Sequence, residues 1–488
     1  MPMADFPNLV PALPEIFMVV AAMILLMLGV FQKDDGKPAN LHAFRLVSGM
    51  GGLVLALALV LAITVGTVSQ STFGGMFVVN DFTVFFKALV LISSVMALVM
   101  SRGFLEAEGI ARFEFPVIMI FSVVGMMMMI SAGDFMALYL GLEIQSLALY
   151  IMAAFHRDDG RATEAGLKYF VLGALASGML LYGASLIYGF AGSTNFAVLA
   201  DSLHGGAGAS LGLIIGVVFV LAGLAFKVSA VPFHMWTPDV YEGAPTPVTA
   251  FFAVAPKLAA MALLIRVLTG PFGGMAAEWQ QIIIFVSIAS MLLGAFAAIN
   301  QTNIKRLMAY SSIGHVGYAL IGVAVGDAVG VRGVLIYLSI YLFMNVGTFA
   351  CILLMRRGGR MVEEIGDLAG LSKTHPRMAL ALGIFMFSMA GIPPLAGFFG
   401  KLYVFLAAID AELYTLAIIG VLSSVVGAFY YLRIVKVMYF DDAVEPFDAP
   451  ESREIGIVLT MSAVLIALFF LYPGPLLGMA GTAAAALF

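Results

Sequence analysis

The chain has 488 residues, of which 62% are hydrophobic and only 11% are charged, and its formal net charge is −5. Soluble domains carry about 25% charged residues, so this balance excludes an ordinary soluble protein, and the absence of basic blocks gives no signal of nucleic-acid binding. The single Cys351 excludes an intrachain disulfide and excludes ligation of an iron–sulfur cluster by this chain alone. No zinc spacing or dinucleotide-binding glycine pattern is present, so we expect no metal or cofactor site.

Apolar stretches long enough to cross a bilayer, about 20 residues each, recur along the whole chain. The first runs from about Leu13 to Phe31 and is too long for a signal-peptide core, so we expect it to be retained. The sequence predicts an all-α polytopic membrane protein with about fourteen crossings. Their centres lie near Met23, Leu57, Leu91, Phe121, Ile144, Leu175, Val220, Leu258, Ile288, Gly314, Phe343, Ser388, Val425 and Leu465.

Basic residues gather beside alternate connections between these crossings. Seventeen of the 24 lie beside the odd-numbered connections, among them Lys33, Lys37, Arg157, Arg356 and Arg453. Cytoplasmic loops carry the excess of lysine and arginine in membrane proteins. We therefore expect a bacterial inner-membrane protein whose odd connections are cytoplasmic and whose two termini are both on the periplasmic side.

Two crossings contain helix-breaking sequences. The stretch from Arg377 to Ile409 is too long for one straight crossing and contains Pro393 and Pro394, which cannot continue a helix. The seventh crossing carries a second candidate break, between Lys227 and Pro232. Because the two breaks are five crossings apart, we expect two inverted five-helix repeats with broken helices 7 and 12. The predicted units are residues 1–111, 112–270 (helices 4–8), 271–441 (helices 9–13) and 442–488.

Four charged residues lie deep inside these apolar crossings. They are Glu143 in the fifth, Lys227 in the seventh, Lys257 in the eighth and Lys401 in the broken twelfth. A charged side chain at mid-bilayer costs roughly 2.5–3.5 kcal/mol on insertion scales, so such residues usually serve function. We expect Glu143 to pair with Lys227, although a protonated Glu143 that only joins two helices is the alternative.

Three further residues extend this set. His315 lies near the centre of the tenth crossing beside hydroxyl side chains, and Lys305 precedes it by nearly three turns. Lys168 lies near the cytoplasmic end of the sixth crossing, where it either reaches the interface or supplies Glu143. Loss of a Glu143–Lys227 pair would favour release of a proton from the lysine, since burial disfavours a lone charge. Lys257 and His315 would then relay the proton to Lys401.

Other polar residues have simpler interpretations. We expect Lys87 and Arg266 to be anchors near the outer surface. His234, Asp239 and Glu242 fall in the seventh connection, among prolines, and their spacing matches no metal pattern. We therefore expect a structural loop there, at the cytoplasmic surface.

Several motifs resemble a known family. The run Pro232-Phe-His-Met-Trp-Thr-Pro-Asp-Val-Tyr-Glu-Gly-Ala-Pro-Thr-Pro-Val-Thr-Ala250 closely resembles the subunit N group of the antiporter-like subunits of proton-pumping NADH:quinone oxidoreductase, respiratory complex I. So do Gly141-Leu-Glu143, the stretch from Lys305 to His315, and Gly391-Ile-Pro-Pro394 leading to Gly400-Lys401. The related subunit M usually has glutamate at the position of Lys401.

The resemblance implies a fourteen-helix fold with inverted repeats and one proton path in the membrane arm of the complex. It implies Glu143 and Lys227 as the input-side pair, Lys257 as the central lysine and Lys401 as the outward-side residue. The partners would be the other membrane-arm and peripheral subunits, the lipid bilayer and protons, with NADH, flavin, iron–sulfur clusters and quinone held by partner subunits.

Two other functions compete with a redox-driven proton pump. A subunit of a multi-subunit sodium/proton antiporter would need the same buried charges, and only the motif resemblance separates the two. A structural scaffold whose charges merely lock helices together is disfavoured, because a scaffold has little reason to keep lysines at several bilayer centres.

Overall fold

The computed structural model describes residues 7–32, 40–204, 210–448 and 452–488. Lys33 and Lys37, counted above among the basic residues of the first connection, lie outside this part of the chain. The first half of the described chain forms α1 (Leu13–Val30), α2 (Leu41–Val65), β1 (Gln70–Thr72), β2 (Phe77–Val79), α3 (Asp81–Ala107), α4 (Glu114–Ser131), α5 (Phe135–Ala153), α6 (Gly160–Ala191), α7 (Phe196–His204), α8 (Leu211–Val228), α9 (Thr237–Gly243) and α10 (Thr246–Thr269).

The second half continues the helical pattern. It forms α11 (Ala276–Ile299), α12 (Ile304–Val325), α13 (Ala328–Leu353), β3 (Arg356–Arg357), β4 (Arg360–Met361), α14 (Leu371–Thr374), α15 (Pro376–Ala390), α16 (Ala396–Asp410), α17 (Tyr414–Phe440), α18 (Arg453–Leu468) and α19 (Gly474–Ala485). Strands β1 and β2 form one short antiparallel hairpin, and β3 and β4 form another.

The all-α prediction is confirmed. Within the described residues, 13 helices are long and apolar enough to cross a membrane. The remaining predicted crossing, the twelfth, falls on two shorter helices, α15 and α16, between which the chain is non-helical from Gly391 to Leu395. The amphipathic helix α7 and the C-terminal helix α19 were not anticipated from the sequence.

Short polar side chains determine where several crossings begin. The Asn80 side chain accepts a hydrogen bond from the N–H of Thr83, whose hydroxyl in turn accepts one from the N–H of Asn80. The side chains of Asp134 and Asn303 likewise accept hydrogen bonds from N–H groups in the first turns of α5 and α12. These caps satisfy donors that a helix start leaves unpaired, which matters most where no water is available.

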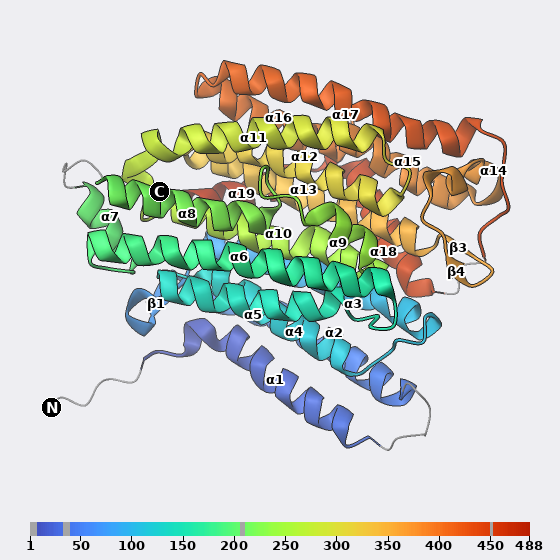
Figure 1. Ribbon diagram of the computed structural model, residues 1–488, viewed down its shortest axis with the longest axis horizontal. Coiled ribbons are helices and arrows are strands. Elements are labelled where there is room, and N and C mark those ends of the chain that lie inside the picture. Colours follow the sequence, from blue (N-terminus) through green and yellow to red (C-terminus); the bar gives the residue numbers. More distant parts are fainter. Residues whose placement is uncertain (1–6, 33–39, 205–209, 449–451) are drawn as a thin grey trace.

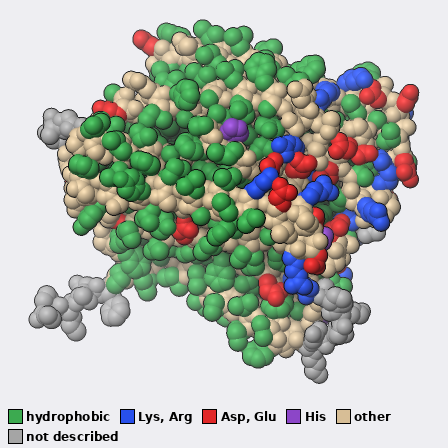
Figure 2. Space-filling view, in the orientation of Figure 1, with side chains coloured by type: hydrophobic (Ala, Val, Ile, Leu, Met, Phe, Trp, Pro, Cys, Tyr) green, Lys and Arg blue, Asp and Glu red, His purple; other side chains and the backbone are tan. Residues whose placement is uncertain are grey.

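The crossings lie side by side, roughly along the long axis of the molecule (Figure 1). One end carries α7 and the β1–β2 hairpin, and the other carries α14 and the β3–β4 hairpin. Both α1 and α19 have their free ends at the first of these ends. Charged side chains gather at the second, which we call the charged end, whereas the flank between the ends is largely hydrophobic (Figure 2).

Three helices form the centre of the bundle. Every residue of α10 from Thr246 to Leu268 is buried, and α12 and α13 are almost as enclosed. By contrast, α1, α2, α6, α17 and α18 bury well under half of their most apolar stretch. A helix that is apolar on every side must be surrounded by protein or lipid. Because protein encloses α10, a residue on this helix is kept from both water and lipid.

Neighbouring helices cross at glycine in several places, among them the α4–α5 pair and the α11–α12 pair. A side chain at Gly125 on α4 would come within 2.6 Å of the Gly141 carbonyl on α5. A side chain at Gly294 on α11 would come within 2.6 Å of the Gly314 nitrogen on α12. Small residues let membrane helices approach closely, so both pairs are held at backbone contact.

The residue Lys87 is not the surface anchor that the sequence led us to expect. Its side chain is 2% exposed, and its Nζ lies 2.6 Å from Oε1 of Glu15, which is also buried. The pair joins α3 to α1. Arg266, also expected near the surface, is 8% exposed and donates to the Ile130 carbonyl at 3.1 Å. Their partners are far away in sequence, so the burial of these two residues could not be predicted from the residues around them.

Breaking this ion pair on one side should destabilise the chain. We expect Lys87→Met to cost about 3–5 kcal/mol, because it leaves the Glu15 carboxylate buried without a cation. The double variant Glu15→Gln/Lys87→Met should recover most of that loss. The amount of chain in assembled complexes on native gels, and its thermal aggregation temperature in detergent, measure both effects. A double variant no better than the single one would contradict this account.

Candidate functional site

The central lysine is Lys257, halfway along the enclosed helix α10. Its side chain is 3% exposed, and its ammonium group donates to the hydroxyl of Ser312 on α12. That hydroxyl also bonds the Tyr341 hydroxyl of α13 at 2.7 Å, and Tyr341 donates to the Ala253 carbonyl at 3.1 Å. The ammonium thus enters a hydrogen-bonded group that joins the three central helices.

The preceding serine of α12 belongs to a second hydrogen-bonded group. Ser311, beside Ser312, bonds the Tyr431 hydroxyl of α17. The same hydroxyl lies 3.0 Å from Nε2 of His315, whose Nδ1 lies 2.6 Å from the Tyr337 hydroxyl on α13. His315 is therefore held at both ring nitrogens by groups that donate or accept a proton. This is the arrangement that a proton relay requires.

The outer residue of the set is Lys401, seven residues after Pro394. It is 6% exposed and donates to the carbonyls of Met389 and Ala390, at 2.9 and 3.1 Å, and to Ser424 of α17 at 2.8 Å. The last carbonyls of a helix have no partner within it, and they carry the negative end of its dipole. The end of α15 at the interruption therefore supplies the acceptors that hold this cation.

A small cavity separates His315 from Lys401. Its volume is about 10 Å³, and it is lined by both of these residues together with Ser311, Tyr318 and Tyr431. A cavity needs roughly 10–15 Å³ to hold one water, so this one is at the lower limit for a single molecule. Its polar walls provide the partners that such a water needs.

Glu143 and Lys227 lie on the other side of Lys257 and do not form the expected ion pair. Lys227, near the end of α8, is 6% exposed and donates to the Ser146 hydroxyl at 2.8 Å. Among the described residues, no cation lies within bonding distance of Glu143, and one oxygen of its carboxylate has no hydrogen-bond partner. Ser146 is three residues after Glu143 on α5, so the lysine bonds the neighbouring turn of the same helix.

The chain after Lys227 leaves the helical conformation. Ser229 ends α8 with a φ of 65°, a left-handed conformation that is uncommon for a residue other than glycine. The N–H of Val231 then donates to Ser290 of α11 at 2.9 Å. The seventh crossing thus ends within the bundle and is followed by the short helix α9.

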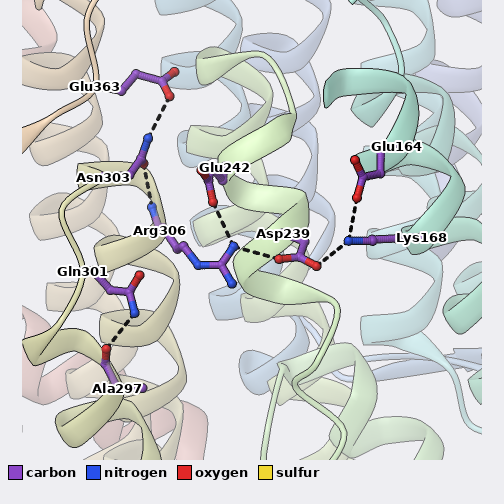
Figure 3. Close-up of polar contacts among 9 residues, drawn as sticks. All are labelled: Glu164, Lys168, Asp239, Glu242, Ala297, Gln301, Asn303, Arg306 and Glu363. Carbon is purple, nitrogen blue, oxygen red and sulfur yellow. Dashed lines mark hydrogen bonds and ion pairs between the residues drawn. The ribbon is translucent and has the colours of Figure 1, made fainter. Parts of the chain in front are cut away.

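Lys168 and Lys305 are not in the central chain of contacts. Lys168 is 41% exposed and forms ion pairs with Glu164 at 2.7 Å and with Asp239 at 2.6 Å (Figure 3). Lys305 is buried at the charged end, where it donates to the Ala244 carbonyl and to Glu363. It lies ten residues from His315 on α12, or about 15 Å along the axis.

The segment predicted as a structural loop contains the helix α9. Its Asp239 lies between Lys168 of α6 and Arg306 of α12, and Arg306 also bonds Glu242 at 2.8 Å (Figure 3). These contacts hold α9 from both sides just before α10 begins, so the segment has the structural role expected of it.

Acid should loosen α9. Burial raises the pKa of Asp239, but hydrogen bonds from Lys168 and Arg306 outweigh burial and leave the pKa below its usual value of 3.8. A depressed carboxylate pKa gives stability that is present above the ordinary pKa and lost as pH falls through the lower one. We therefore expect the contact to persist at pH 5 and to weaken only below about pH 4.

Substitution tests the same contact at neutral pH. Asp239→Asn should speed hydrogen exchange of the α9 backbone roughly two- to fivefold, the range for partly exposed ion pairs. The control Glu164→Gln removes only the outer pair and should leave α9 exchange unchanged. Equal exchange in wild type and Asp239→Asn would show that packing alone holds α9.

Several members of the site were missed from the sequence. Tyr341 bonds the Ser312 that holds Lys257, and Tyr337 and Tyr431 bond His315. Ser146 and Ser424 hold the outer two lysines. The available signal was the four-residue spacing of Tyr337 and Tyr341, which places both on one face of a helix. In the described residues no group of three or more histidine, cysteine or acidic side chains is arranged to hold a metal ion.

The fold and this site define a class of protein, namely polytopic membrane proteins with titratable side chains linked through the interior of the bundle. A family model described as the NADH:quinone oxidoreductase/Mrp antiporter transmembrane region matches residues 132–427. NADH-quinone oxidoreductase subunit N of Paramagnetospirillum magneticum is 61% identical over 485 residues, which cover 99% of this chain and 98% of that protein.

Solved structures of membrane complexes contain chains with a similar fold. A chain of respiratory complex I from Thermus thermophilus with bound aureothin has a TM-score of 0.80 and 31% identity, covering 96% of this chain and 99% of that one. A chain of an Mrp complex from a Dietzia species has a TM-score of 0.81 at 24% identity, covering 97% of each chain, which shows a shared fold. The chain therefore belongs to the NADH:quinone oxidoreductase/Mrp antiporter family of membrane subunits.

Proposed function

We propose that this chain is the antiporter-like subunit N of a proton-pumping NADH:quinone oxidoreductase and that it carries protons across the membrane. The observation that carries this proposal is the position of Lys257, on a helix buried along nearly its whole length and bonded to Ser312. Burying a cation there is costly, so its presence indicates a function. The identity of 61% to a subunit N over nearly the full chain supports the same assignment.

The proposed path has an input side, a relay and an output side. On the input side a proton is exchanged between Glu143 and Lys227, whose ammonium swings between that carboxylate and Ser146. Lys257 receives the proton and passes it through the serine and tyrosine hydroxyls to His315. Lys401 then releases it toward the outer surface.

Within each of the two hydrogen-bonded groups, the relay works by reorientation of side chains that are already in contact. Transfer from Lys227 to Lys257, between the two groups, and from His315 to Lys401 needs a rearrangement or a bridging water. A hydroxyl accepts a proton on one lone pair and gives up its own on the other side, so a proton moves without displacement of heavy atoms. The unpaired oxygen of Glu143 provides an acceptor that attracts the Lys227 ammonium. Lys168 and Lys305 stand at the charged end, where they would guide protons to the input side.

We further propose that residues 112–270 and 271–441 are inverted repeats, between an N-terminal unit of residues 1–111 and a C-terminal unit of residues 442–488. The Gly125–Gly141 and Gly294–Gly314 crossings support this, because each joins the first two helices of one proposed repeat. We also propose that the charged end lies in the cytoplasm and that both termini lie in the periplasm of a bacterial inner membrane. The free ends of α1 and α19 lie opposite the charged end, as this orientation requires (Figure 1).

The partners proposed for this chain are the other membrane-arm and peripheral subunits of the complex. NADH, flavin, iron–sulfur clusters and quinone belong to those partners, because this chain offers neither the thiolates nor the nucleotide-binding pattern that such groups need. The energy for translocation must therefore arrive through contacts with neighbouring subunits.

The alternative is a subunit of a sodium/proton antiporter, favoured only by the fold shared with the Mrp complex. Native gels of gently solubilised membranes, probed for this chain and stained for NADH dehydrogenase activity, separate the two functions. Co-migration with a large NADH-oxidising complex supports the pump. Migration in a large complex without that activity, while the NADH-oxidising complex runs intact elsewhere, would refute the assignment.

A further inference from the structure

A second cavity lies at the charged end, away from the proton path. It has a volume of about 540 Å³ and lies between the beginnings of α15 and α18. Arg377 and Arg453 line it, together with His375 and the apolar side chains of Met378 and Leu459. The lining of the cavity therefore combines cationic groups with apolar side chains.

The two arginines have no carboxylate partner among the described residues. Other arginines of the charged end do: Arg356 lies 2.6 Å from Glu108, and Arg357 lies 2.9 Å from Asp367. Asp448, the acidic residue of the cavity wall, already accepts hydrogen bonds from the N–H groups of Gly358 and Gly359 at 3.0 and 2.8 Å.

Both arginines also occupy positions that disfavour a cation. Arg377 is the second residue of α15 and Arg453 the first of α18, where the helix dipole is positive. An anion between the two helix starts would be stabilised by both side chains and by both dipoles. Next to them, Nδ1 of His375 is buried without a hydrogen-bond partner.

Next to the cavity, both helices present an exposed apolar side chain. Leu380 on α15 is 60% exposed and Ile457 on α18 is 67% exposed. Each lies one helical turn after its arginine, so each arginine has an exposed apolar side chain beneath it on the same helix face. A free phosphate would contact only the arginines, whereas a phospholipid would contact both the arginines and the apolar side chains.

We propose that this cavity binds an anionic phospholipid. Arg377 and Arg453 clamp its phosphate from two sides, and the acyl chains run along α15 and α18 past Leu380 and Ile457. Basic pockets between membrane helices on the cytoplasmic side are typical sites for anionic head groups. The site requires only that the chain spans a membrane, so it stands independently of the proton path.

The test uses the intact complex purified from native membranes, with Arg377→Gln/Arg453→Gln as the variant. Arg332→Gln is the matched control, because Arg332 lies on α13 outside the cavity. A photoreactive phosphatidylglycerol should crosslink to peptides of α15 and α18 in wild type and in the control. Crosslinking should fall roughly fivefold for each arginine removed, and the variant Arg377→Lys/Arg453→Lys should retain most of it.

Competing probes identify the ligand. Unlabelled phosphatidylglycerol should suppress the crosslink, whereas phosphatidylcholine and inorganic phosphate at the same concentration should not. Equal crosslinking by a zwitterionic probe, or unchanged crosslinking in the double glutamine variant, would overturn the proposal. So would crosslinks that fall only on a neighbouring subunit at this position, since a protein segment would then occupy the cavity.

Discussion

Replacement of Lys257 by methionine should stop proton transfer through this subunit. Methionine has a similar length but no group that holds a proton. Ser312 and Tyr341 would therefore have no proton donor or acceptor on α10. Loss of a positioned proton-transfer group typically costs about 10²–10⁴-fold, and we expect a loss of at least 100-fold here. An apolar side chain suits the enclosed helix, so the variant should still fold and assemble.

The measurement is NADH-driven acidification of inverted membrane vesicles, expressed per NADH oxidised and per assembled complex. Lys373→Met is the matched control, because Lys373 is an exposed lysine at the charged end, and it should pump as the wild type does. Lys257→Arg keeps the charge but binds its protons too tightly to release them, so it should also fail. Normal pumping in an assembled Lys257→Met complex would remove the central relay from the mechanism.

The second large effect is expected at Gly397, just inside α16. Its N–H donates to the Ser388 hydroxyl at 2.9 Å, and a methyl group there would lie only 1.9 Å from the Ser388 carbonyl oxygen. Gly397→Ala must therefore push α15 and α16 apart at the interruption. Overpacking of this kind costs about 1–3 kcal/mol, and it would move Lys401 away from the carbonyls that hold it.

A displacement of about 1 Å at a positioned group lowers a rate by roughly 100-fold. We therefore expect Gly397→Ala complexes that assemble to pump poorly while retaining NADH oxidation by partner subunits. In the control Gly178→Ala, in α6, the added methyl group meets nothing within 4 Å. The control should assemble and pump normally, and equal behaviour of the two variants would contradict the role given to the α15–α16 joint.

The crossings and the depth of Lys257 were predictable because each follows from one local property. A crossing needs only a run of apolar residues of fixed length, and the depth of a lysine follows from its place in that run. The interruption after Ala390 was likewise signalled by Pro393 and Pro394, which cannot continue a helix whatever surrounds them.

The contacts within the site were much less predictable. Tyr337 and Tyr431 resemble ordinary packing residues in an apolar sequence, and only the meeting of α13 and α17 around His315 gives them a role. The pairing of Glu143 with Lys227 was inferred from opposite charge, yet Ser146 lies closer to the lysine. Lys87 was predicted to lie near a surface, because nothing in its own crossing indicates that Glu15 of another helix is its partner.

The cavity between His315 and Lys401 has a consequence for a membrane at rest. A volume of about 10 Å³ cannot hold a continuous column of water. The proposed path is therefore interrupted between these two residues in this conformation, and we expect few protons to pass back through it down the electrochemical gradient. An idle subunit should keep the membrane electrically tight, and conduction should be limited to the brief rearrangements that the rest of the complex imposes.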